Sequence, residues 1–208
     1  MKNKQRNRYS VLYLTQLALL VAVECVMKMI GLGSVPVGPL YMSFLTVPIA
    51  IGAIVMGPMA SMILGGVFGF VSFMDAIKGA SIMTSNLLAV SPVHTFALCF
   101  VMRVLMGLCV GGVYGLMTKI SKKRMLNCFV TSLSAPLLNT LLFMGYIVLA
   151  FYQTEYIQGM AAANGAANPM MFVAALVGVQ GVVEAVVCSV VGTAVAGGLL
   201  KAFGRPTR

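Results

Sequence analysis

Three residues inside otherwise apolar stretches have side chains that could hold a charged or strongly polar ligand. Arg103, Asn139 and Glu184 each lie well away from the ends of a long apolar run. A charge at such a position is costly in a membrane, so it needs a partner or a function. The guanidinium fork of arginine suits a carboxylate, and amide or carboxylate groups suit hydroxyls and amides. Two roles are open: an Arg103–Glu184 ion pair completed by Asn139, or a site for a polar ligand.

Five further residues, at the ends of the apolar runs, are candidates for ligand contact, and most have a structural alternative. Ser91 can cap a helix that starts at Pro92, and His94, the only histidine, would then be an interfacial residue. Tyr41 follows a segment rich in glycine and proline and is either an aromatic lid or a membrane-interface anchor. The other two candidates are the amides Asn86 and Gln180.

Motifs of the common catalytic and metal sites are missing from the sequence. It has no P-loop of the form Gly-x4-Gly-Lys-Ser/Thr, no His-Glu-x-x-His and no Gly-x-Ser-x-Gly. The five cysteines stand singly in apolar runs, so we expect them to be small buried residues and not metal ligands. The sequence therefore predicts neither an enzyme nor a metal or cofactor site.

The composition indicates a membrane protein. Of 208 residues, 60% are hydrophobic and only 9% are charged, whereas soluble domains have roughly 25% charged residues. The formal net charge is +10, but the basic residues form short clusters beside the apolar runs. Membrane topology and contact with anionic lipid explain such clusters better than nucleic-acid binding does.

The apolar runs predict an all-α, single-domain bundle of six membrane spans in residues 1–208. The spans cover about 10–30, 40–56, 60–77, 93–117, 125–151 and 170–200. Basic clusters precede the first span, separate the fourth from the fifth and follow the sixth, which places both termini in the cytoplasm. A tight turn at Gly57-Pro58 is expected between spans two and three, and a short helix capped by Thr154 in the last outer loop.

Small residues recur at every fourth position in four of the spans. In spans three, four and six we expect these stripes to pack the helices of the bundle against one another. The Ala18 and Ala22 face of span one could equally contact another protein. Glu24 and Lys28 are expected to form a local pair, and Asp75 an interfacial position near the end of span three.

Several short motifs, in order along nearly the whole chain, resemble one family of membrane proteins. They are Ala18-x3-Ala22, Gly52-x4-Gly57-Pro58, Gly65-x3-Gly69-Phe70-x-Ser72, Ser91-Pro92, Arg103-Val104-Leu105-Met106-Gly107, Asn139-Thr140 and Glu184-Ala185. The sequence resembles the substrate-binding S components of bacterial energy-coupling factor (ECF) vitamin transporters, and most of all the pantothenate-type members. Met102 departs from this pattern, because proline is expected before Arg103 in close relatives.

The resemblance implies a function that needs other proteins. An S component captures a vitamin from outside, then joins a membrane scaffold (T) subunit and two cytoplasmic ATPases in the bacterial cell membrane. It implies that Ala18 and Ala22 contact the scaffold and that the vitamin is pantothenate. The ligand contacts it implies are Tyr41, Asn86, Ser91, His94, Arg103, Asn139, Gln180 and Glu184. Another vitamin (riboflavin, folate or a pyrimidine precursor), a stand-alone secondary transporter and a membrane enzyme are the alternatives.

Overall fold

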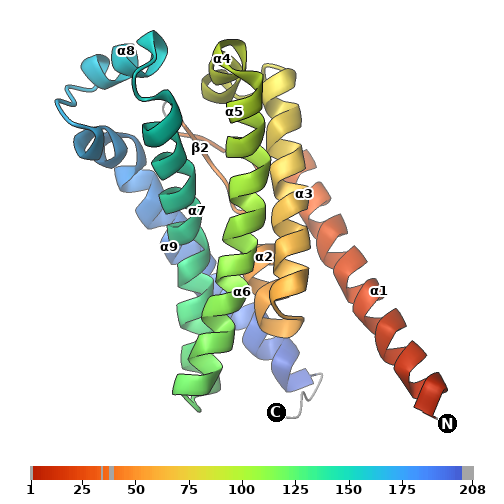
Figure 1. The fold of residues 1–208 in the computed structure, drawn as a ribbon. Helices are drawn as coiled ribbons and strands as arrows, with labels where there is room; N and C mark the ends of the chain where they lie inside the picture. The colour runs from red at the N-terminus through yellow and green to blue at the C-terminus, as the bar shows by residue number, and fades with distance from the viewer. Residues whose placement is uncertain (1, 34, 38–39, 203–208) are drawn as a thin grey trace.

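The protein is a bundle of long helices, with one small β-hairpin. The computed structural model describes residues 2–33, 35–37 and 40–202, with the backbone alone for residues 2–10, 36–37, 40–42 and 179. In chain order the elements are α1 (Lys2–Met29), β1 (Val35–Val37), β2 (Leu40–Met42), α2 (Thr46–Val55), α3 (Pro58–Ile77), α4 (Ile82–Val90), α5 (Pro92–Phe96), a π-helical turn η1 (Ala97–Val101), α6 (Met102–Ile120), α7 (Arg124–Phe151), α8 (Glu155–Ala163) and α9 (Pro169–Ala202). Figure 1 shows α1 leaning away from the other long helices. The predicted all-α membrane fold is thus confirmed.

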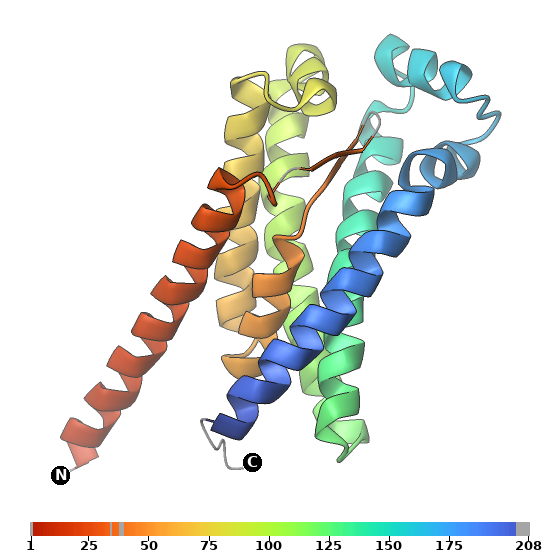
Figure 2. The same ribbon diagram turned by 180° about the vertical axis from the view of Figure 1, so that it is seen from behind.

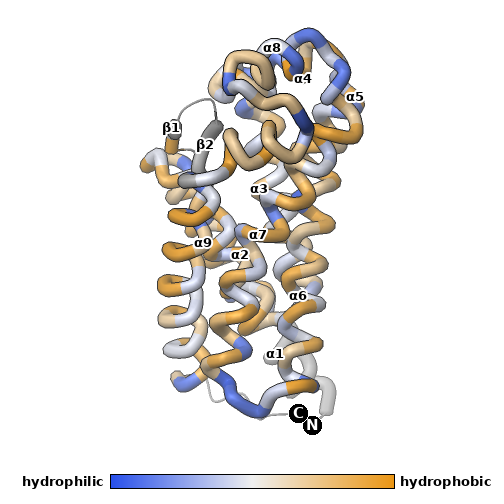
Figure 3. Tube along the Cα trace, turned by 90° about the vertical axis from the view of Figure 1, so that its left-hand side faces the viewer, coloured by the Kyte–Doolittle hydropathy of each residue, from blue (hydrophilic) through white to orange (hydrophobic). Residues whose placement is uncertain are grey.

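Five helical segments are long and apolar enough to cross a membrane in the part of the chain that the structure describes. They are Val11–Met29, Pro58–Ile77, Pro92–Ile120, Arg124–Phe151 and Gln180–Ala202. Each lies within one of the predicted spans or matches it to a few residues. Hydrophilic segments gather at the two ends of the bundle, and the helices between them are mostly hydrophobic (Figure 3). This distribution is the one expected of helices that stand in a bilayer.

The second predicted span differs from the others in its structure. Helix covers only Thr46–Val55, all ten residues of which are buried, and ten residues rise about 15 Å, half of a bilayer core. The first part of the expected span belongs to the hairpin, in which β1 and β2 pair antiparallel. The expected turn is present: Gly57 has φ 99° and Pro58 starts α3. A short buried helix and a hairpin therefore replace a full membrane helix here.

The chain runs up and down along the bundle, so several of its connections lie at the same end. The start of α1, the α6–α7 connection and the end of α9 lie at one end of the bundle (Figure 2). The connection between α2 and α3 lies toward that end too, so the chain runs back to it through the hairpin and α2 (Figures 1 and 2). We call this end the basic end, because residues 119–124 include four Lys and Arg residues, and the opposite end the cap end.

Helices α3 and α6 pack through glycines so closely that their backbones touch. A Cβ on Gly65 would lie 2.3 Å from the carbonyl oxygen of Arg103, and one on Gly107 would lie 2.1 Å from that of Ser61. The Ser61 hydroxyl donates a hydrogen bond to the Gly107 carbonyl oxygen over 2.7 Å. In a bilayer such close packing holds helices together where the hydrophobic effect does not act between them. The predicted packing role of the small residues is confirmed for these two helices.

The small residues of α9 are used less uniformly than expected. A Cβ on Gly197 would meet the Met125 sulfur of α7 at 3.1 Å, which is a packing contact. A Cβ on Gly181 would meet only Val177 of its own helix, and Gly181 lines an open groove beside α7. The prediction of bundle packing for this stripe is therefore right at its basic end and wrong at Gly181, because α7 and α9 leave a groove there.

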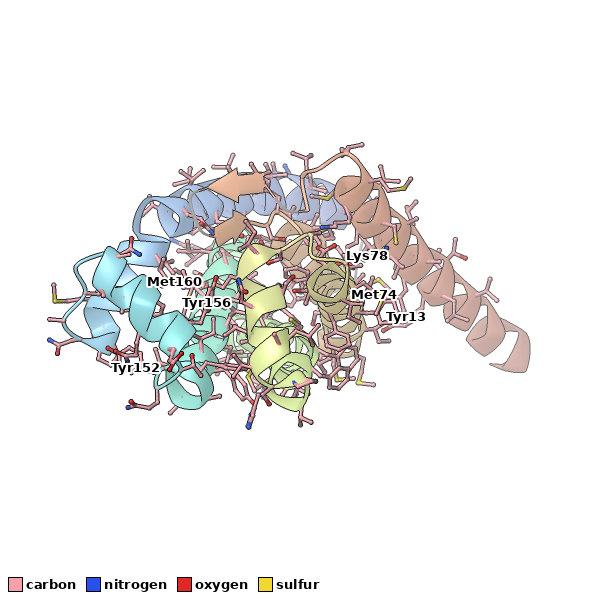
Figure 4. All side chains as sticks on the ribbon, turned by 90° about the horizontal axis from the view of Figure 1, so that it is seen from above. Tyr13, Met74, Lys78, Tyr152, Tyr156 and Met160 are labelled. Carbon is pink, nitrogen blue, oxygen red and sulfur yellow. The ribbon has the colours of Figure 1, made fainter. Side chains whose placement is uncertain are left out.

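The cap end is closed by the two short helices α4 and α8. Thr154 caps α8 as predicted, since its hydroxyl accepts a hydrogen bond from the Ile157 backbone N–H over 3.4 Å. Seen from above, Tyr156 and Met160 of α8 lie on the side facing α4 (Figure 4). A buried apolar cluster that includes residues of α4, α7, α8 and α9 lies beneath them. This cluster separates the interior of the bundle from the cap-end surface.

Candidate functional site

A small polar cavity lies in the cap half of the bundle. Its volume is about 90 Å³, which exceeds the roughly 30 Å³ that one water occupies in the liquid. Its polar lining side chains come from α3, α4, α6, α7, α9 and the segment after the hairpin: Ser43, Ser72, Asp75, Ser81, Thr84, Arg103, Asn139, Thr140 and Glu184. The three residues singled out inside the spans, Arg103, Asn139 and Glu184, all line it. A hollow with an apolar wall and several polar groups is the default place for a small ligand.

Arg103 is the most constrained side chain of the cavity. Its guanidinium carbon lies 4.5 Å from the ring centroids of both Phe68 and Phe143, so two cation–π contacts hold the group. Its Nη1 donates a hydrogen bond to the Asn139 side-chain oxygen, while its Nε is buried without a partner. A buried donor without an acceptor is unfavourable, so an acceptor on a ligand would be stabilised there.

The helix that carries Arg103 is shaped to bring it there. The π-turn η1 ends at Val101, two residues before Arg103, and it adds a residue to the turn, which changes the side-chain register of α6 relative to α5. The Arg103 carbonyl then rests on Gly65 of α3. Because both the register and the backbone contact are set by packing, the guanidinium is held in place before any ligand arrives.

Glu184 is held separately from Arg103. It is 4% exposed, and its Oε1 accepts a hydrogen bond from the backbone N–H of Ser43 over 2.8 Å. Of the two roles left open by the sequence, the Arg103–Glu184 ion pair is not formed among the described residues. Arg103 instead donates to Asn139, and Glu184 accepts from the Ser43 backbone. The two side chains therefore line one cavity without a direct ion pair between them.

Four of the residues expected to contact a ligand lie elsewhere. Asn86 is exposed and donates to the Ile82 carbonyl oxygen of its own helix over 2.9 Å. His94 is exposed, and its Nδ1 is 3.0 Å from the Tyr146 hydroxyl. Ser91 precedes α5 but makes no side-chain capping bond, and the Gln180 side-chain oxygen is buried without a partner. None of the four lines the cavity, since α4 contributes Met83 and Thr84 to it instead of Asn86, and α9 contributes Glu184 instead of Gln180.

The fifth of these residues, Tyr41, is described by its backbone alone. It lies in β2, opposite Pro36 of β1, and its side chain lies outside the described residues. The hairpin itself is close to the cavity, since Ser43 directly after it holds Glu184. A ligand contact by Tyr41 thus stays a prediction.

Other lining residues were not singled out from the sequence, although some of them leave a signal there. Phe143 follows Asn139 by four residues on α7, so the two share a face of that helix. Phe68 and Asp75 lie seven residues apart on α3, again on one face. Helical spacing from an intramembrane polar residue would have found the aromatic ring of Phe143. Nothing in the sequence indicates Thr84 or Ser81, which α4 brings in from outside the long helices.

The pairing of charges near the start of the hairpin differs from the expected one. Lys28 forms an ion pair with Asp75 of α3 and not with Glu24, because α3 brings a second carboxylate to the end of α1. Asp75 is thus not merely interfacial, since it also lines the cavity. Glu24 is 2% exposed, and neither of its carboxylate oxygens has a hydrogen-bond partner.

The described residues contain no group of three His, Cys, Asp or Glu side chains that could hold a metal ion. Ala18 and Ala22 are exposed on α1, so this face is open to a partner, whereas most helices of the bundle bury one face. The cavity of the described structure thus has no metal-binding cluster beside it, and the Ala18 and Ala22 face of α1 is exposed.

The comparisons with known proteins agree with this geometry. The family model described as ECF transporter, substrate-specific component, matches residues 12–196. A search of curated proteins gave no match. Because the family model covers almost the whole bundle, including the cavity, the chain belongs to the substrate-specific components of ECF transporters, which are substrate-binding membrane subunits and not enzymes.

Proposed function

We propose that this protein captures a carboxylate-bearing vitamin, pantothenate before any other, for an ATP-driven ECF importer. The observation that carries the proposal is the Arg103 guanidinium, fixed by two rings and with a buried Nε that lacks an acceptor. Pantothenate has one carboxylate, one amide and two hydroxyl groups. The carboxylate would bind Arg103, and Asn139, Thr140 and Glu184 offer partners for the amide and the hydroxyls.

The size of the cavity adds a condition to this proposal. Sites for drug-sized ligands usually measure about 300–1,000 Å³, and this cavity measures about 90 Å³. A vitamin would therefore be admitted when α4 or the hairpin, which adjoin the cavity, moves outward. Such a movement would carry Tyr41 of the hairpin and Asn86 of α4 with it, while Ser91, His94 and Gln180 are further candidates for ligand contact in the wider site.

The proposed orientation places the basic end in the cytoplasm of a bacterial cell, with both termini and residues 119–124 inside. The hairpin and α2 would then serve as the second of six crossings. The cavity lies in the cap half, and so would open to the outside, where a vitamin is captured. Attachment to the scaffold subunit, which works with two cytoplasmic ATPases, would use the exposed Ala18 and Ala22 face of α1.

The decisive binding experiment compares pantothenate with its alcohol analogue, in which CH₂OH replaces the carboxylate. The purified chain should bind pantothenate at one per chain, and Arg103→Ala should weaken this binding by more than roughly tenfold, the loss of one charged hydrogen-bond partner. The alcohol should bind weakly to both proteins. Arg124→Ala, at an exposed arginine of the basic end, is the matched control and should leave the affinity for pantothenate unchanged.

Two outcomes would contradict the proposal. A folded Arg103→Ala variant with unchanged pantothenate affinity would make Arg103 purely structural. Riboflavin, folate or a pyrimidine precursor displacing pantothenate at much lower concentration would reassign the vitamin. Transport separates the remaining classes, because uptake into proteoliposomes should require the scaffold and ATPase subunits. Gradient-driven uptake by this chain alone would instead indicate a secondary transporter.

A further inference from the structure

A second, apolar recess lies between α7 and α9 on the outside of the bundle. This α7/α9 groove measures about 880 Å³ and is bounded by residues that include Phe129, Leu137 and Leu149 of α7 and Met170 and Val182 of α9. Almost all of its lining is hydrophobic, and Leu149 at its wall is 87% exposed. The groove is a separate feature from the polar cavity and needs an apolar occupant.

The length of the groove matches the membrane. From Phe129 to Leu149 is twenty residues of helix, about 30 Å at the usual rise, which is the thickness of the hydrocarbon core. One leaflet therefore faces about 15 Å of the groove. Counted from Phe129, that distance ends close to Thr140, eleven residues further along α7. A lipid chain from the leaflet at the basic end would thus fill the half between Phe129 and Thr140.

The charges at the two ends of the groove differ, and this selects the headgroup. At the basic end, Lys122, Lys123 and Arg124 are exposed directly before Phe129. They form no ion pair among the described residues, and the whole chain has only four acidic residues, at positions 24, 75, 155 and 184, none of them at this end. At the cap end α7 is followed by Gln153 and Glu155, so no basic residue adjoins the groove there.

We propose that the groove binds one anionic phospholipid, with its headgroup on residues 122–124 and an acyl chain between α7 and α9. Phe129 lies five positions after Arg124, about 7 Å along the helix, which is room for the glycerol between headgroup and chain. Each basic residue near an anionic headgroup contributes attraction of about 1 kcal/mol. A zwitterionic lipid could occupy the groove but would gain little from these charges.

The end of the lipid's acyl chain would contact the wall of the polar cavity. Thr140, Met144 and Val177 line both the groove and the cavity, so single side chains separate the lipid from the ligand chamber. An acyl chain in the groove would press on this wall and resist its outward displacement. The site does not depend on which vitamin fills the cavity, and it is testable without any vitamin.

The absence of tryptophan from the chain permits a direct test by fluorescence quenching. Phe129→Trp places a single tryptophan at the basic end of the groove. Ile63→Trp is the depth-matched control, since Ile63 is also exposed and lies five residues after the start of α3, as Phe129 does after the start of α7. Each variant of the full chain is reconstituted in phosphatidylcholine vesicles that contain brominated phosphatidylglycerol or brominated phosphatidylcholine.

We expect brominated phosphatidylglycerol to quench Trp at position 129 with at least about fivefold preference over phosphatidylcholine, the effect of one engaged basic residue. At position 63 the two lipids should quench about equally. The double change Lys123→Gln and Arg124→Gln should abolish the preference at 129, whereas Lys78→Gln at the cap end should leave it. Leu137→Trp, deeper in the groove, is the second probe if Phe129→Trp folds poorly.

A groove-filling variant supplies an independent arm. Val186 of α9 lines the groove, and it lies six residues before Gly192, whose Cβ would meet Ser132 of α7, so it faces the half between Phe129 and Thr140. Val186→Phe should lower the number of phosphatidylglycerol molecules that native mass spectrometry finds retained by one, whereas Val191→Phe, at an exposed position of α9 outside the groove, should not. Equal quenching by both lipids at position 129 would overturn the proposal. Weak quenching by both would overturn it too, because a helix of another chain would then cover the groove.

Discussion

The contact between Gly65 and the Arg103 backbone makes the position of the guanidinium testable with a single methyl group. In Gly65→Ala the new Cβ would start 2.3 Å from the Arg103 carbonyl oxygen, and an ordinary contact needs at least 3.4 Å. Both atoms in conflict belong to rigid helix, so α3 and α6 must separate by roughly 1 Å. Overpacking of this kind costs about 1–3 kcal/mol, offset by less than about 1 kcal/mol of helix propensity.

The neighbouring glycine provides the control. A Cβ on Gly66 would find its nearest neighbour, Val104, at 3.6 Å, which is ordinary contact. Gly66→Ala should therefore be neutral or slightly stabilising, through helix propensity alone. The two variants differ by one residue on the same helix and by nothing in composition, so any difference between them reports the backbone contact.

Thermal unfolding in detergent and ligand titration measure the two consequences. Gly65→Ala should lower the midpoint of unfolding relative to Gly66→Ala, and should weaken pantothenate binding by several-fold, since Arg103 moves between the rings of Phe68 and Phe143. If the two alanine variants have the same midpoint and the same affinity, the reasoning is refuted, because the close approach would then neither set the helix spacing nor place the guanidinium.

Three further predictions test other parts of the structure. Phe143→Leu removes one ring from the Arg103 guanidinium and should weaken carboxylate binding by about two- to fivefold, the value of a partly buried cation–π contact; the same change at exposed Phe70 should not. Ala18→Trp should block assembly with the scaffold and ATPase subunits in co-purification while leaving ligand binding by the isolated chain intact. Thr154→Ala should destabilise the cap by about 1 kcal/mol in thermal unfolding, through the lost helix cap, with little effect on Ala18-dependent assembly.

The long helices could be predicted from the sequence because one physical requirement dominates them. A span needs about twenty apolar residues and excludes unpaired charge, so the bounds of α3 and α7 follow from hydropathy and from Pro58 and Arg124. The same reasoning placed Arg103, Asn139 and Glu184 at one depth. The depth of a residue in the membrane follows from its distance to the end of its own span, so it can be read from the sequence. Equal depth was enough to predict that these three residues lie at one cavity.

Partners across helices could not be predicted in this way. The intrahelical spacing of Glu24 and Lys28 indicates a local pair, but the choice between Glu24 and Asp75 depends on how α1 lies against α3, which no local pattern encodes. No pattern in the sequence predicts the π-turn before Arg103 either. The second span was overestimated because a short hairpin and a buried short helix are as apolar in sequence as a membrane helix.

The Lys28–Asp75 ion pair gives the two halves of the protein a common element. Asp75 belongs to the chamber, and Lys28 belongs to the helix that carries the alanine face. A bound molecule that competes for the Asp75 carboxylate weakens the ion pair and so changes the affinity of α1 for a partner. A partner that moves α1 then changes the affinity of the cavity for that molecule by the same factor, because linkage between two sites is reciprocal. A partly exposed pair of this kind is worth at most about 1 kcal/mol. Through this ion pair, the bound ligand and the partner of α1 would change each other's affinity by no more than roughly fivefold.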